Sequence, residues 1–153
     1  MPLKDDELSK ARKQAMYLLG LKAYSEYDLK LKLLKNYNEE ICEEVISKMK
    51  EYDFIDDHKY AKNVCSHLLR DKKYGEKLIL FELKKHGIAY ETCKNALSNY
   101  NKDDYLIAIK DLINKKYKKF ALDEGERRRA VNALVRRGHY YGLILEVIKD
   151  FEE

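Results

Sequence analysis

The sequence predicts an all-α fold of three tandem three-helix units, stacked into an elongated, curved helical repeat protein. Proline occurs once and glycine six times in 153 residues, so little interrupts regular structure. The segment 83–88 (LKKHGI) is echoed 51 positions later by the segment 134–139 (LVRRGH). A period near 50 residues is typical of supersecondary units that stack on one another. No stretch shows the alternation of apolar and polar residues that would favour a strand.

Capping residues and glycines mark the predicted helix ends. Ser25, Asn101 and Asp123 are each followed three positions later by an acidic residue, which is the spacing of a capping box. Gly87 and Gly138 follow basic residues, as is usual at a helix C-terminus. The predicted helices are 8–20, 26–35, 39–52, 57–71, 76–86, 90–99, 103–117, 124–137 and 141–151.

These helices group into units 1–55, 56–100 and 101–153. Each helix is too short to be stable alone and must bury an apolar stripe against its neighbours. In helix 124–137 that stripe consists of Ala130, Val131, Leu134 and Val135. Three further glycines, at positions 20, 75 and 125, are either flexible points between elements or simple helix ends.

Positive charge is concentrated in the later units. Residues 1–55 carry ten basic and eleven acidic side chains, whereas the segment 110–137 carries ten basic and only four acidic ones. Such a concentration indicates an anionic partner, which could be nucleic acid, an acidic protein groove or a membrane surface. The alternative is a solvated helix face.

The arginines of helix 124–137, together with the lysines before it, are the strongest candidates for anion binding. Arg129 and Arg136 are seven positions apart and form a row on the solvent side of the helical wheel, together with Arg137. Arg128 lies at the border of the apolar stripe, and Arg127 lies on its apolar side but in the first turn. The full candidate set is Lys115, Lys116, Lys118, Lys119, Arg127, Arg128, Arg129, Arg136 and Arg137.

A second, smaller basic row comes from Lys72, Lys73, Lys77 and Lys84. Here a solvated face is the preferred interpretation and anion binding the alternative. Most of the thirteen tyrosines are expected to pack between helices or at helix ends. Tyr140 and Tyr141 follow the arginines closely, so they are the best candidates for stacking on bases.

No residue pattern indicates enzyme, metal or cofactor chemistry, so we expect a protein that is not an enzyme and needs no cofactor. Cys65 and His67 form the closest Cys/His pair, without further ligands at zinc-site spacing. The acidic pairs 56–57 and 103–104 are more simply helix starts. Three cysteines without framework spacing favour free thiols in the cytoplasm, and we expect neither a secretory signal nor a membrane span.

Over residues 11–151 the sequence resembles the regulatory protein RecX family. The most recognisable junction is the segment 54–61 (FIDDHKYA). In the first unit the resemblance also includes the segments 11–19, 25–29 and 32–33. In the second unit it includes Gly75, Ile79 and the segments 82–83 and 87–88. In the third unit it includes Arg129, Leu134, Ile144 and the segments 136–138 and 147–148. Position 139 is His, where an aromatic residue is usual after Arg-Arg-Gly.

The resemblance implies a modulator of the RecA recombinase. Family members bind the RecA filament on single-stranded DNA, seat in its helical groove, and typically limit filament growth, ATP hydrolysis and strand exchange in recombination, DNA repair and the SOS response. The resemblance thus implies that RecA and its filament are the partners, that the protein also binds DNA weakly and directly, and that it is a monomer. Two alternatives stay open from the residues alone: a stand-alone nucleic-acid-binding protein that grips phosphate with its basic row, and a helical scaffold for an acidic protein.

Overall fold

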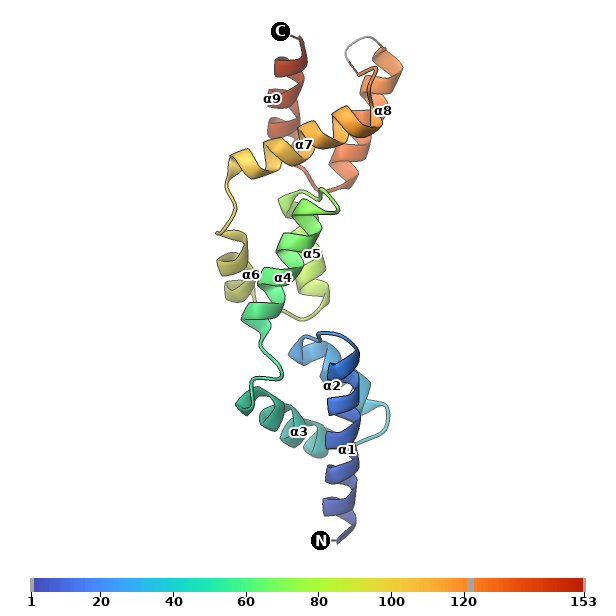
Figure 1. Ribbon diagram of the computed structural model, residues 1–153, viewed down its shortest axis with the longest axis vertical. Coiled ribbons are helices and arrows are strands. Elements are labelled where there is room, and N and C mark those ends of the chain that lie inside the picture. The colour runs from blue at the N-terminus through green and yellow to red at the C-terminus, as the bar shows by residue number, and fades with distance from the viewer. Residues whose placement is uncertain (1, 121–122, 153) are drawn as a thin grey trace.

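The computed structural model describes residues 2–120 and 123–152, and within these ranges it contains nine α-helices and no strand (Figure 1). The molecule is elongated, with three groups of three helices following one another along its long axis. The predicted all-α helical repeat is confirmed. The helices are α1 (Pro2–Leu21), α2 (Glu26–Leu34), α3 (Glu39–Glu51), α4 (Asp57–Arg70), α5 (Glu76–Lys85), α6 (Tyr90–Leu97), α7 (Lys102–Lys116), α8 (Glu124–Arg136) and α9 (Tyr141–Glu152).

The predicted helix bounds agree with the structure to within two residues, except at the start of α1. This helix begins at Pro2 rather than at residue 8. Proline is tolerated in a first helical turn, where its missing N–H would have no intrahelical partner. Asp5 also lies in that turn, where a carboxylate complements the positive end of the helix dipole.

The predicted caps form, but only Asn101 makes a reciprocal capping box. Its side chain accepts a hydrogen bond from the Asp104 amide at 3.1 Å, and the Asp104 carboxylate accepts one from the Asn101 amide at 2.8 Å. Ser25 likewise caps the Asp28 amide, at 3.1 Å. The Asp28 carboxylate, however, contacts His86 Nδ1 at 2.6 Å, so it links α2 to the end of α5.

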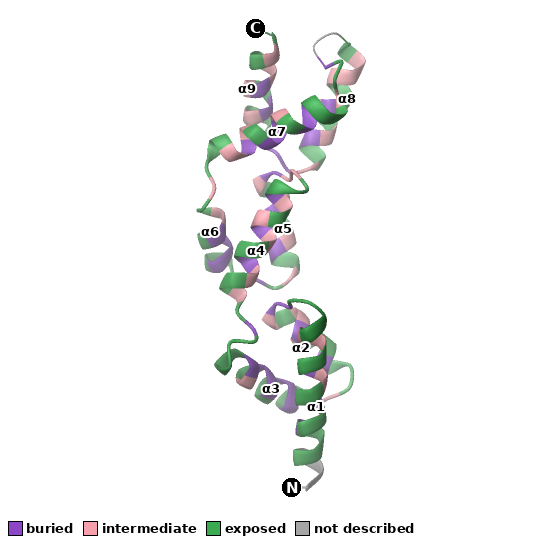
Figure 2. Cartoon of the chain, viewed as in Figure 1, coloured by how far each residue is buried: buried purple, intermediate pink, exposed green. Residues whose placement is uncertain are grey.

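Three hydrophobic cores follow one another along the chain, as the buried residues in Figure 2 show. The first is built from α1, α2, α3 and Ile55, and the third from α7, α8, α9 and Phe120. The middle core includes residues of α4, α5 and α6, together with Tyr105 and Ala108 from α7. Because α7 contributes to two cores, the second and third groups are packed together. The unit boundaries at 55/56 and 100/101 stay predictions.

The repeat extends to the cysteines. Cys42 Sγ donates to the carbonyl five residues earlier at 3.8 Å, and Cys93 Sγ does the same at 3.6 Å. Both side chains are buried, as is Cys65, and all three are free thiols, as predicted. Burial raises the pKa of the Cys65 thiol to about 11. These thiols therefore stay protonated near neutral pH and act as small core residues.

Successive groups are joined end to end by the same kind of contact. The start of α5 meets the end of α8, where the Gly75 amide donates to the Arg137 carbonyl at 2.8 Å. The start of α2 meets the end of α5, where Ser25 Oγ donates to the His86 carbonyl at 2.6 Å. At the first joint, N–H groups at the start of α5 bond carbonyls at the end of α8, which satisfies both. At the second joint, the Ser25 side chain satisfies the carbonyl at the end of α5.

Glycine is required at the α5–α8 joint. Gly138 has φ +90° and ends α8, as predicted from its position after Arg137. A Cβ on Gly138 would lie 2.4 Å from the Leu78 backbone nitrogen, and one on Gly75 would lie 2.4 Å from that of His139. Of the two interpretations of Gly75, a flexible point or a helix end, the structure favours the second: it is the N-cap of α5, held by close backbone contact.

Candidate functional site

Three segments converge beside the α5–α8 joint: the loop between α4 and α5, the C-terminal half of α7, and the end of α8. They enclose two adjoining cavities of about 390 and 290 Å³, which share Leu112, Lys116 and Arg137 in their linings. We call this surface the junction groove. Its remaining lining residues are Asp71, Lys72, Lys73, Tyr74, Leu78, Asp111, Lys115, Tyr117, Ala133, Leu134 and Arg136.

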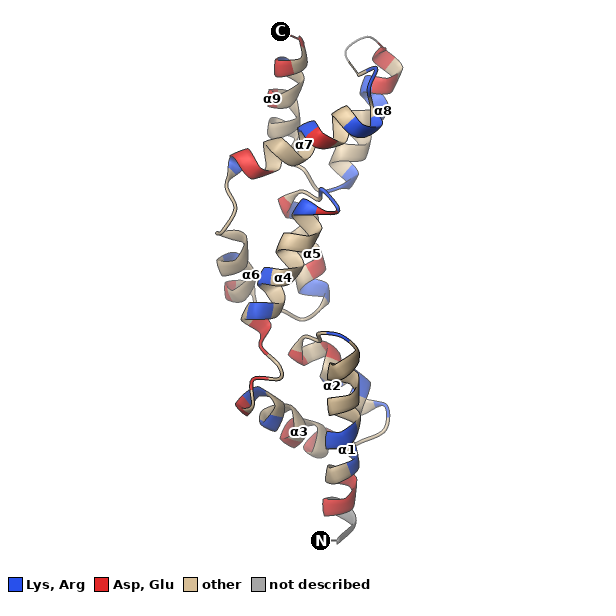
Figure 3. Cartoon of the chain, in the orientation of Figure 1, with Lys and Arg blue, Asp and Glu red and all other residues tan. Residues whose placement is uncertain are grey.

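The junction groove is positively charged. Six of its lining residues are basic and two are acidic. Both carboxylates are engaged within the protein: Asp111 pairs with Lys73 at 3.2 Å, and Asp71 contacts His67 Nδ1 at 2.8 Å. Figure 3 shows basic residues in the α4–α5 loop and at the end of α8, which lie near one another. A concave surface lined mainly by one sign of charge concentrates ions of the other sign.

Arg137 links the groove to the joint. Its guanidinium donates to the Lys72 carbonyl and lies over the Tyr74 ring, 5.8 Å from the ring centroid. The side chain is half-buried, although the helical wheel predicts that it faces solvent. The reason is that α8 ends at Arg136: Arg137 is the C-cap residue, and the helical wheel no longer describes its direction.

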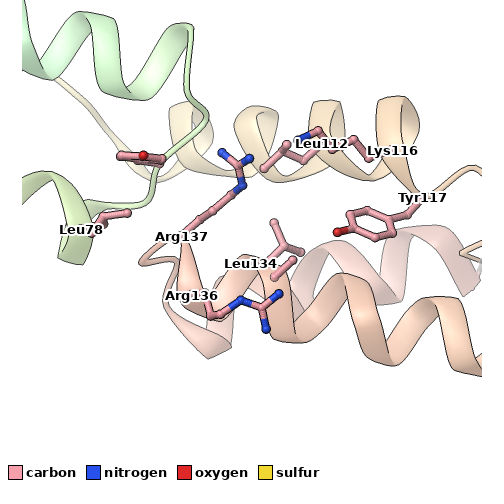
Figure 4. A pocket seen from close by; sticks show the side chains of 9 residues that line it. Leu78, Leu112, Lys116, Tyr117, Leu134, Arg136 and Arg137 are labelled. Carbon is pink, nitrogen blue, oxygen red and sulfur yellow. The ribbon is translucent and has the colours of Figure 1, made fainter.

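The exposed positive charge of the groove comes from Lys72, Lys115, Lys116 and Arg136. In Figure 4, Arg136 and Arg137 extend on different sides of Leu134, with Arg137 directed toward Leu112 of α7. The Tyr117 ring is directed back toward Leu134. Guanidinium and ammonium groups next to an aromatic ring and apolar side chains can hold an anion that also has a flat apolar part, as a nucleotide does.

The other residues of the main candidate set lie apart from the two cavities. Arg128 and Arg129 are exposed on α8, and Lys118 and Lys119 are exposed after α7. Arg127 turns inward, as its place on the apolar side suggested: its Nε donates to the Phe120 carbonyl at 3.3 Å, and its Nη1 pairs with Glu152 at 3.4 Å. Arg127 is therefore part of the packing of the third core.

The second row divides in two. Lys72 and Lys73 line the junction groove, although the sequence favoured a solvated face for them. The ammonium of Lys77 instead lies over the Tyr140 ring at 4.8 Å, and that of Lys84 lies over the Tyr90 ring at 5.8 Å. Each of these two lysines, both on α5, makes a cation–π contact with a ring outside that helix.

Sequence reasoning missed the aromatic part of the groove. Tyr74 directly follows Lys72 and Lys73, and Tyr117 lies between Lys116 and Lys118. Aromatic residues interleaved with lysines are a signal of nucleic-acid binding, so both could have been proposed as candidates. Leu112 and Leu134 also line the groove, but their positions in the sequence indicate only core residues.

His139 holds the α4–α5 loop against the joint. Its Nε2 lies 2.8 Å from the Lys73 carbonyl and therefore donates to it, while the buried Nδ1 has no hydrogen-bond partner in the described part of the chain. Lys73 has φ +59°, the left-handed conformation that turns this carbonyl toward His139. Burial lowers the pKa of His139 below its usual value near 6.5, and the nearby charge of Arg137 acts in the same direction.

We expect the stability of the protein to fall as the pH drops below about 6.5. Below that pH His139 binds a proton in the unfolded chain but not yet in the folded protein. Acid therefore favours unfolding until the pH reaches the lower pKa of His139 in the folded protein. Urea unfolding between pH 5 and pH 7.5 measures this. His139→Gln keeps a donor for the Lys73 carbonyl but cannot titrate, so its free energy of unfolding should change less with pH. If the free energy of unfolding changes equally with pH in both proteins, His139 is not the group responsible.

Within residues 5–120 and 123–152, no three His, Cys, Asp or Glu side chains are placed to hold a metal ion. His67, two positions after Cys65 in the sequence, contacts the Asp71 carboxylate at 2.8 Å. None of the described helices is both long enough and apolar enough to cross a membrane.

Comparison with known proteins identifies relatives along nearly the whole chain. A protein-family model described as "RecX, first three-helix domain" matches residues 11–49. The regulatory protein RecX of Clostridium acetobutylicum is 30% identical over 155 residues, which cover 97% of this chain and 72% of the relative. That of Chlorobium limicola is 28% identical, over 94% of this chain and 91% of the relative.

Solved structures share the fold. The crystal structure of RecX from Lactobacillus salivarius matches with a TM-score of 0.86 over 97% of this chain and 98% of that one, at 22% sequence identity. A second crystal structure, titled regulatory protein RecX, matches with a TM-score of 0.85 over 95% of this chain. The resemblance seen in the sequence is confirmed: the chain belongs to the regulatory protein RecX family.

Proposed function

We propose that this protein binds the RecA recombinase filament on single-stranded DNA and restrains its growth, ATP hydrolysis and strand exchange. The observation that carries the proposal is the junction groove, where basic residues from three separate segments meet in a chain of the RecX family. An elongated stack of helices also suits a long contact along a filament (Figure 1). On this proposal the protein acts in the cytoplasm, as a monomer and without a cofactor.

The physical requirement is a difference in affinity between filament states. A ligand shifts an assembly equilibrium only by as much as it prefers one state over the other. The assembled filament would be such a preferred state, because RecA and its DNA together form an anionic surface. Free RecA lacks the DNA phosphates. Lys115, Lys116 and Arg136 are the exposed cations that we assign to this contact, and Lys72 and Lys73 extend it.

The proposal is tested by titrating the purified protein into RecA assembled on single-stranded DNA. We expect the rate of ATP hydrolysis and the mean filament length both to fall at micromolar protein concentration. A rate and a length that stay unchanged over that range would refute the proposal for this chain.

One observation favours a second candidate, direct binding of nucleic acid without RecA. Tyr74 and Tyr117 line the same cavity as Lys116, Arg136 and Arg137, and such a combination can stack a base and hold its phosphate. Direct phosphate binding depends steeply on salt, with a log–log slope near 0.7 for each phosphate contacted in a single strand. A steep slope with DNA alone favours the second candidate, and binding that requires RecA favours the first.

A further inference from the structure

A separate cavity, of about 470 Å³, lies where the starts of α5, α7 and α9 come together. Its lining includes Tyr100, Tyr105 and Tyr140, with Glu76 and Glu146 among its polar residues. We call it the tyrosine pocket. It shares no lining residue with the junction groove, and its carboxylates give it the opposite electrostatic character.

The Tyr105 hydroxyl is the first observation that points to a ligand in the pocket. Tyr105 is only 4% exposed, and its hydroxyl has no hydrogen-bond partner among the residues that the structure describes. Buried polar groups are nearly always hydrogen-bonded, so an unpartnered buried hydroxyl on a residue that lines a cavity needs an explanation. Burial, and then the negative charge of Glu76, raise the pKa of Tyr105, so the hydroxyl stays neutral and can accept a hydrogen bond.

The carboxylates of the pocket are not equivalent. Glu146 is neutralised by Lys102, whose ammonium lies 2.8 Å away. Glu76 forms no ion pair within residues 5–120 and 123–152, and burial together with the nearby charge of Glu76 raises the pKa of Tyr140. Its neighbour Lys77 is directed to the Tyr140 ring instead. Glu76 is thus a carboxylate without a cation, next to three aromatic rings.

These features together describe a receptor for a planar cation. Tyrosine rings attract cations through their faces, and a guanidinium can stack on a ring while its N–H groups donate sideways. A carboxylate and a neutral hydroxyl can accept the hydrogen bonds that the N–H groups of a guanidinium donate. An ammonium could pair with Glu76, but it is more strongly hydrated and lacks the flat face that stacking uses.

We propose that the tyrosine pocket receives an arginine side chain of a protein partner, with the guanidinium paired to Glu76 and stacked on the tyrosines, and with the pocket wall relaxing so that the guanidinium also donates to the buried Tyr105 hydroxyl. The pocket would then anchor a basic protein segment, while the junction groove binds an anion on a separate surface. The assignment does not depend on RecA, because any partner that presents an accessible arginine could fill the site.

The test uses the full chain and N-acetyl-arginine amide as the probe. The ring signals of labelled tyrosines are followed by NMR during titration with this amide, with the neutral isostere N-acetyl-citrulline amide and with N-acetyl-lysine amide. We expect saturable shifts of Tyr105 and Tyr140 with the arginine probe, and binding about tenfold weaker for the other two. The citrulline probe lacks the charge that pairs with Glu76, and the lysine probe lacks the flat face that stacks on the tyrosines. Equal binding of citrulline or of lysine would overturn the guanidinium assignment.

Two variants separate the pocket from general effects. Glu76→Gln should weaken binding of the arginine probe about tenfold. Its matched control is Glu91→Gln, another first-turn glutamate, on α6 and outside the pocket. Gly142→Leu should block the pocket without unfolding the protein, because a Cβ there meets nothing within 4 Å. If both variants bind the probe as well as the control while remaining folded, the proposal is wrong.

Discussion

Replacing Lys116 and Arg136 together by glutamate is expected to weaken binding to the RecA filament by at least about 100-fold, since each charge-assisted contact contributes about 1.5–3 kcal/mol. Both residues line the junction groove, and both are exposed. Their reversal therefore changes the charge of the groove without removing a structural contact. Fluorescence anisotropy on preformed filaments, and on single-stranded DNA alone, measures the loss.

Arg136 is a better target than its neighbour Arg137. A pair reversal at 136 and 137 would also break the contact of Arg137 with the Lys72 carbonyl and the Tyr74 ring, so lost binding could reflect a damaged joint. The matched control is Arg12→Glu with Lys94→Glu, two exposed basic residues on α1 and α6. If this control weakens binding as much as the groove variant does, only the total charge matters and the groove is not the site.

Gly75→Ala is expected to destabilise the protein by about 2–4 kcal/mol, the usual range for overpacking combined with a lost backbone hydrogen bond. The new Cβ would lie 2.4 Å from the His139 nitrogen and 2.5 Å from the Gly138 carbonyl carbon. These are backbone atoms, so relief requires the joint to open. Opening would lengthen the 2.8 Å bond from the Gly75 amide to the Arg137 carbonyl.

Urea unfolding compares Gly75→Ala with Gly20→Ala. A Cβ at Gly20 meets nothing within 4 Å, and alanine in a helix is more favourable than glycine by up to about 1 kcal/mol. The control should therefore be as stable as the parent protein or slightly more so. Should the two variants unfold at the same urea concentration, the close packing at the α5–α8 joint would be refuted.

Local chemistry made most of the fold predictable. Asn101, Ser25 and Asp123 cap helices as their side chains dictate, and Gly87 and Gly138 take the positive φ that ends a helix. The start of α1 was less predictable, because a proline near a terminus is compatible both with a first turn and with an extended start. Helix ends depend on a few residues, which is why the other bounds came within two positions.

The junction groove could be predicted only in part. Lys115, Lys116 and Arg136 were identified as a charge concentration, but Arg137 contacts Lys72, which is 65 positions away in the sequence. No helical periodicity relates two such positions, because their meeting depends on how the second and third groups of helices stack. Arg127 shows the same limit: the wheel placed it on the apolar side, but its Phe120 contact arises from a loop that periodicity cannot describe.

The most direct measurement of the junction groove as the filament contact is site-specific photo-crosslinking. A photoreactive phenylalanine replaces Tyr117, which lines the groove, or Tyr90, which is exposed on α6. Each protein is mixed with RecA on single-stranded DNA and irradiated. We expect crosslinks to RecA or to the DNA from position 117, and few from position 90. Crosslinks from position 90 with none from position 117 would contradict the assignment of the groove.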